Sequence, residues 1–243
     1  MIARRQALCL LAVTALAGCG SPAGAPASAG VPVSAAAPAA DEFRTALTEL
    51  QTITYRYAAD AQYRNPADPR HRDVSRIHVA GAHDPAAKAF TREYRDGDGA
   101  GAEIGKITVL DRVAYTWTGR DRTWNQVNLA VFDPKTFLLA VDPGDPAGLA
   151  AFTRSVDRVT RTGRYTFEGT LDLSRAGDDS FLPLGAPGLL TSGDDGASFT
   201  AKTDVVGHVT EIVVTLRTQG ESLVQTIQLI GHGEPVDITK PKK

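Results

Sequence analysis

The chain has 243 residues, of which 42% are hydrophobic and 22% are charged, and its formal net charge is −2. This length suits one domain with a sizeable core. Acidic and basic residues are mixed along the chain without the basic stripe that a phosphate backbone requires, so nucleic acid is not expected as a partner.

Residues 1–18 are typical of a signal peptide. Arg4 and Arg5 precede an apolar run at residues 7–16, which at about ten residues is roughly half the length of a bilayer-spanning helix. We therefore expect this segment to be removed. The arginine pair leaves open whether export uses the general secretory or the twin-arginine route.

The stretch Leu16-Ala17-Gly18-Cys19 resembles the lipobox of bacterial lipoproteins. The resemblance implies transfer of a diacylglyceryl group to the Cys19 thiol and cleavage just before it. The alternative is an ordinary signal peptide cleaved near Ala17, with Cys19 incidental. On the lipobox interpretation Cys9 is lost, and the mature chain keeps one acylated cysteine and no intramolecular disulfide. We expect a lipid-anchored protein on the outer, extracytoplasmic face of the cell membrane.

Residues 19–40 follow the lipobox as a linker. From residue 20 onward they are mostly Ala, Pro, Gly, Ser and Val, and they carry no charge. Such a stretch cannot bury enough apolar surface to offset its ordering entropy, so it is predicted to be a disordered tether. A single β-rich domain is expected over residues 41–243.

Hydrophobic periodicity predicts the elements of this domain in chain order. A helix is expected at residues 41–50 and an alternating strand at residues 53–63. Asp133-Pro134 and Asp145-Pro146 each place an N-cap acid before a proline, which predicts short helices at 133–139 and 145–156. Further strands are predicted at 74–79, 89–94, 104–110, 113–117, 165–173, 199–203, 209–216, 223–230 and 235–239.

This order indicates an α+β fold, with an antiparallel sheet and helices grouped against one face. Several stretches also resemble one protein family. These are the strand Val113-Ala114-Tyr115-Thr116-Trp117, the strand at 165–173 and the ending at 227–241. They are similar to the actinobacterial LppX/LprAFG-type lipoproteins, which belong with the LolA/LolB-like lipid carriers.

The resemblance implies an open half-barrel with helices packed on its concave side. It also implies an apolar cavity that binds or carries the acyl chains of a lipid or lipoglycan. Tyrosine and tryptophan suit the wall of such a cavity, because they add a polar tip to a large apolar area. The alternative is that the same side chains fill an ordinary core. The candidate residues are Ile53, Tyr55, Tyr57, Ala59, Val113, Tyr115, Trp117, Tyr165, Phe167 and Leu171.

No pattern in the sequence indicates catalysis. The chain has no HExxH, CxxC, Walker A or Gly-x-Ser-x-Gly motif, and its five histidines are dispersed. We therefore expect no enzyme activity, no cofactor and no metal. The alternatives to a lipid carrier are a non-catalytic envelope sensor or protein-interaction lipoprotein, whose partner would be an envelope protein, and a structural surface lipoprotein without a ligand.

Overall fold

The computed structural model describes residues 38–64, 67, 72–131, 142–176, 197–217, 220 and 222–242. The predicted signal peptide, Cys19 and the helix expected at 133–139 lie outside these residues. Residues 37–243 form one compact unit. Its helices α1 (Ala39–Leu50) and α2 (Leu149–Ser155) have 12 and 7 residues, and no helix in the described part of the chain is long and apolar enough to span a bilayer.

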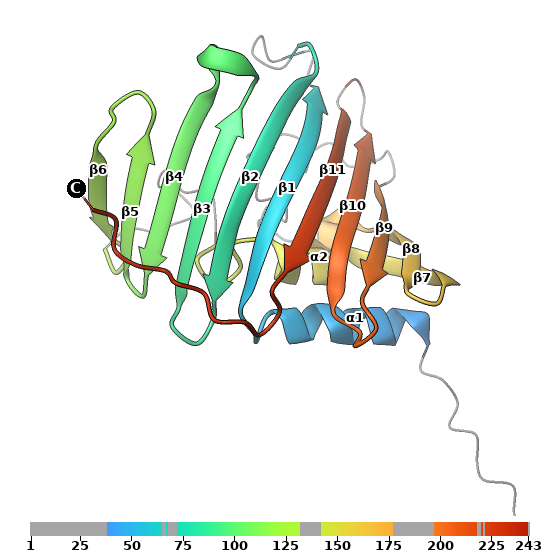
Figure 1. The fold of residues 1–243 in the computed structure, drawn as a ribbon. Helices are drawn as coiled ribbons and strands as arrows, with labels where there is room; N and C mark the ends of the chain where they lie inside the picture. The colour runs from blue at the N-terminus through green and yellow to red at the C-terminus, as the bar shows by residue number, and fades with distance from the viewer. Residues whose placement is uncertain are drawn as a thin grey trace, which may run out of the picture. The chain divides into compact units, whose positions relative to one another are not determined.

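Eleven described strands form one antiparallel sheet, in the order β6-β5-β4-β3-β2-β1-β11-β10-β9-β8-β7 (Figure 1). The sheet is open, with β6 and β7 as its edges, and the predicted fold class is confirmed. The elements are α1 (Ala39–Leu50), β1 (Tyr55–Arg64), β2 (Ser75–Asp84), β3 (Ala89–Asp96), η1 (Gly99–Gly101), β4 (Glu103–Leu110), β5 (Val113–Thr118), β6 (Trp124–Asn128), α2 (Leu149–Ser155), β7 (Val156–Gly163), β8 (Thr166–Leu171), η2 (Leu173–Ala176), β9 (Ala197–Thr203), β10 (Val209–Arg217) and β11 (Ser222–Ile230).

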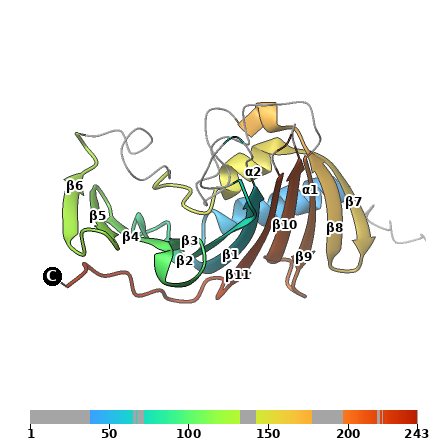
Figure 2. The same cartoon turned by 90° about the horizontal axis from the view of Figure 1, so that it is seen from above.

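Both helices lie on the concave side of the sheet, over the half formed by β1 and β11 to β7 (Figure 2). The apolar face of α1 packs there because its buried residues recur at helical spacing. The Phe43 ring stacks on Phe199, with centroids 5.3 Å apart, and meets Phe152 of α2 edge-on at 6.4 Å. This half of the concave face is therefore a packed aromatic core.

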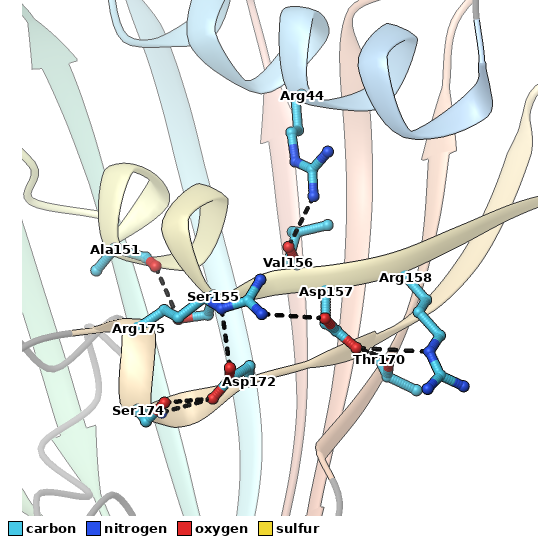
Figure 3. A network of polar contacts seen from close by, with 10 residues as sticks. All are labelled: Arg44, Ala151, Ser155, Val156, Asp157, Arg158, Thr170, Asp172, Ser174 and Arg175. Carbon is cyan, nitrogen blue, oxygen red and sulfur yellow. Dashed lines mark hydrogen bonds and ion pairs between the residues drawn. The ribbon is translucent and has the colours of Figure 1, made fainter.

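Polar contacts join the helices to the edge strand β7 (Figure 3). The Arg44 guanidinium of α1 donates to the carbonyl of Val156, at 3.0 Å. The backbone carbonyl of Ser155, the last residue of α2, accepts a hydrogen bond from the backbone N–H of Asp172, at 2.7 Å. Arg175 bridges the carboxylates of Asp172 and Asp157, at 2.8 and 3.4 Å. These contacts hold the sharp change from helix to strand at residue 156.

The structure corrects the predicted elements around this junction. The helix expected at 145–156 begins only at Leu149, and Val156 already belongs to β7. Strands β6 and β7 were not predicted as separate strands. Both are edge strands whose exposed positions carry polar residues, so neither shows the apolar alternation of β1.

The strand predicted at 235–239 is also wrong. The described residues after Ile230 contain no strand and cross the convex face, opposite the helices (Figures 1 and 2). Strand β11 pairs with β1 on one side and with β10 on the other. The segment that follows β11 therefore has no free edge beside that strand with which to pair. Side chains fasten the start of this segment instead: the Thr54 hydroxyl and the Arg56 guanidinium donate to the carbonyls of Glu234 and Pro235.

Candidate functional site

The predicted cavity residues do not all share one face of the sheet. Tyr55, Tyr57 and Ala59 of β1 point to the concave side, as do Phe167 and Leu171 of β8, and all five are buried. Ile53 packs partly buried against the same core. Tyr165 lies in the turn between β7 and β8, with the Arg164 guanidinium 5.0 Å from its ring centroid.

Val113, Tyr115 and Trp117 of β5 point to the opposite, convex face. The register places the neighbouring residue Ala114 beside Val109 of β4, and both are fully buried on the concave side. Tyr115 and Trp117 instead lie beneath Lys240 and Lys106, whose ammonium groups are 5.5 and 5.8 Å from the ring centroids. These three residues therefore do not border a cavity on the concave side. Alternation shows that two faces differ, but only the pairing register shows which face is inward.

Two aromatic rings on the concave face lie over glycines of the next strand. A Cβ at Gly81 would overlap the Tyr57 ring, and one at Gly105 would overlap the ring of Tyr94. The Tyr57 hydroxyl donates to the carbonyl of Thr91, at 3.1 Å. Both rings therefore lie along the sheet, over the backbone of the neighbouring strand, instead of standing up from it.

The other half of the concave face, on β3 to β6, carries a second apolar cluster. Neither described helix lies over it (Figure 2). Its buried members are Phe90, Ile107, Val109 and Ala114, and the partly buried Val127 and Leu129 pack against them. We call these six residues the distal cluster. They are separate from the aromatic core beneath α1 and α2.

Two buried polar side chains lie between the distal cluster and the aromatic core. In the sheet register, Arg92 of β3 is opposite both Gly81 and Ile107, and His83 of β2 is opposite Phe90. Arg92 is 6% exposed and His83 is 2% exposed. Within the described residues, the Arg92 Nε and the His83 Nδ1 have no hydrogen-bond partner. Buried polar groups normally have one, so both groups are candidates for contact with a ligand.

Burial governs the charge of both groups. It lowers the pKa of His83 to about 4, against the opposing influence of Asp84, so the imidazole is neutral at pH 7. Burial also lowers the pKa of Arg92, but an arginine stays protonated in proteins. Its guanidinium carbon lies 5.7 Å from the centroid of the Tyr94 ring. The concave face therefore combines an apolar wall with one buried cation.

Neither residue was predicted from the sequence. The alternation of β3 could have indicated Arg92, because residues 90, 92 and 94 lie on one face of the strand and Arg92 stands between Phe90 and Tyr94 on it. The site can hold an apolar chain beside an anionic group. The histidines are dispersed in the sequence, but His208 and His232 come together with Asp204 beside the start of β10 and the end of β11, where they could hold a metal ion.

No family model matches the chain, and no curated protein matches its sequence. Two of the solved structures to which the chain is similar each share 12% sequence identity with it. One is the lipoprotein LppX of Mycobacterium tuberculosis, with a TM-score of 0.45 over 82% of this chain and 97% of that one. The other is a LolA superfamily protein of Nitrosomonas europaea, with a TM-score of 0.35 over 84% and 99%. Because both TM-scores are below 0.5, the function proposed next rests on the geometry of the concave face.

Proposed function

We propose that this protein is a non-catalytic lipoprotein of the cell envelope that holds an acyl chain of a lipid against the distal cluster. The observation that supports the proposal is the apolar half of the concave face that no described helix covers, bordered by the buried Arg92. Acyl chains are held by apolar contact, at about 25 cal/mol for each Å² removed from water. No described helix packs on the distal cluster. Phe90, Val109 and Ala114 are already fully buried, so an acyl chain would replace contacts that they now make.

Arg92 suits the head group of the lipid. A buried cation is costly unless it is paired, and a guanidinium pairs well with a phosphate or carboxylate. An anionic head group at Arg92 would place the acyl chain along Ile107 and Val109, which follow on the neighbouring strand β4. The neutral His83 beside it can donate or accept a hydrogen bond.

A photocrosslinking experiment tests this proposal on the full chain. The protein, processed in a bacterial membrane and purified in mild detergent, is incubated with phosphatidylglycerol that carries a photoactivatable acyl chain. We expect crosslinks in peptides of β3, β4 and β5. Arg92→Leu should lower the yield about tenfold, since a charge-assisted hydrogen bond is worth about 1.5–3 kcal/mol.

Two further variants serve as comparisons. Arg95→Leu removes an exposed arginine from the convex side of the same strand and should leave the yield unchanged. Ala114→Trp adds bulk within the distal cluster and should block crosslinking, with the melting temperature recorded in parallel. Crosslinks confined to the convex face, or equal yields from Arg92→Leu and Arg95→Leu, would contradict the proposal and favour a protein-interaction module.

A further inference from the structure

Two loops meet beside the start of β10 and the end of β11, in the half of the sheet that does not carry the distal cluster. The turn at residues 204–208 leads into β10, and residues 231–234 follow β11. Strands β10 and β11 pair antiparallel, with Glu211 beside Gln228, so the start of one lies next to the end of the other. His208 and His232, which are 24 positions apart in the sequence, thus become neighbours. Their rings stack, with centroids 4.9 Å apart at an interplanar angle of 26°.

Hydrogen bonds hold these side chains in defined orientations. Oδ1 of Asp204 accepts bonds from the backbone N–H groups of Val206, Gly207 and His208, at 2.8–2.9 Å. The other carboxylate oxygen, Oδ2, lies 3.4 Å from Nδ1 of His208. Nε2 of His232 lies 3.0 Å from the carbonyl oxygen of Val209. If Nε2 carries the proton and donates a hydrogen bond to this carbonyl, Nδ1 of His232 keeps a lone pair that can bind a metal ion.

We propose that Asp204, His208 and His232 form a binding site for a late first-row divalent metal ion, with Zn²⁺ as its representative. One potential ligand atom from each residue lies within 4.8 Å of the other two. At metal–ligand distances of about 2.0–2.1 Å, the ligand atoms of a tetrahedral site lie about 3.3 Å apart. The 3.4 Å between Oδ2 and Nδ1 matches this edge and is long for a hydrogen bond.

The remaining contacts fit such a site. Imidazole and carboxylate together favour zinc, copper or nickel over magnesium and calcium, which take oxygen ligands. Histidine ligands commonly donate their second ring N–H to a backbone carbonyl, as His232 can donate to Val209. Three protein ligands leave a fourth position for water. All three residues are partly exposed, so an ion can reach them.

A bound ion would tie the C-terminal segment to the sheet. His232 directly precedes the residues that cross the convex face, whereas Asp204 and His208 belong to the turn between β9 and β10. The ion would therefore crosslink two loops that otherwise share few bonds. The site lies away from the distal cluster and does not depend on lipid binding.

Metal titration of the full chain tests the site. After treatment with EDTA and dialysis, the protein is titrated with Zn²⁺ in calorimetry and with Co²⁺, whose visible absorption reports tetrahedral coordination. We expect one ion per chain and a rise in melting temperature with Zn²⁺ but not with Mg²⁺. His208→Ala and His232→Ala should each weaken Zn²⁺ binding at least tenfold and abolish the cobalt spectrum.

His78→Ala is the matched control, because His78 is a surface histidine that contacts the carboxylate of Asp60 on β1. It should keep the affinity, the spectrum and the thermal shift of the parent chain. Equal affinity in all three variants would overturn the assignment. So would the absence of saturable Zn²⁺ binding by the parent chain at millimolar concentration.

Discussion

His83 is a buried residue whose protonation should lower the stability of the fold. Burial lowers its pKa from 6.5 to about 4 in the folded chain. Between these two pH values the unfolded chain binds a proton that the folded chain does not, so stability falls as the pH falls. At about 1.4 kcal/mol for each pKa unit, we expect a loss of about 3 kcal/mol from pH 7 to pH 4.

Urea unfolding of the parent chain and of His83→Leu, from pH 7.5 to pH 4, measures this contribution. The variant lacks the titrating group, so its free energy of unfolding should fall less steeply with decreasing pH than that of the parent. Parallel pH profiles would show that the imidazole is not held neutral by the fold.

At the scale of single elements, the start of α2 depends on a residue outside the helix. The Asp145 carboxylate accepts bonds from the backbone N–H groups of Leu149, Ala150 and Ala151, at 2.7–3.3 Å. Gly148, the residue just before the helix, has a φ of 68° and no side chain to cap it. The predicted capping role of Asp145 is therefore confirmed, although the helix starts four residues later.

Asp145→Ala should cost about 1–2 kcal/mol of unfolding free energy, because it leaves helix N–H groups without their acceptor. Asp142→Ala is the comparison, since within the described residues this carboxylate bonds only the exposed N–H of Gly144 in the same loop. We expect it to change stability by less than about 0.5 kcal/mol. If the two variants shifted the urea midpoint by the same amount, the capping role of Asp145 would be contradicted.

At the scale of the whole molecule, the sequence predicts that the chain is held at a membrane by the lipidated Cys19. Two acyl chains anchor stably, whereas a single chain anchors only marginally. Cys19→Ser should therefore remove labelling by a palmitate analogue and move the protein from the detergent phase to the aqueous phase. Cys9→Ser, the control within the predicted signal peptide, should change neither measurement. Continued labelling of Cys19→Ser would contradict the lipobox interpretation.

Local periodicity was sufficient to predict α1, β1 and the α+β class with its antiparallel sheet, whereas the open half-barrel was what the family resemblance implied. The spacing of Phe43, Ala46, Leu47 and Leu50 and the alternation of residues 55–63 recur as burial patterns in the structure. These patterns depend only on neighbours along the chain, because one helix or strand presents its own apolar face whatever covers it. The lipobox that ends at Cys19 likewise depends only on residues that adjoin one another in the sequence.

Tertiary structure alone decided which residues meet. Sheet register placed Tyr115 and Trp117 on the convex face, away from Tyr55 and Tyr57, and brought Arg92 beside the distal cluster. Pairing of β10 with β11 brought His208 to His232. Because both neighbours of β11 are occupied, residues 235–239 had no free edge beside that strand on which to pair. Each outcome depends on long-range strand pairing, which aligns residues far apart in sequence and leaves no local periodic signal.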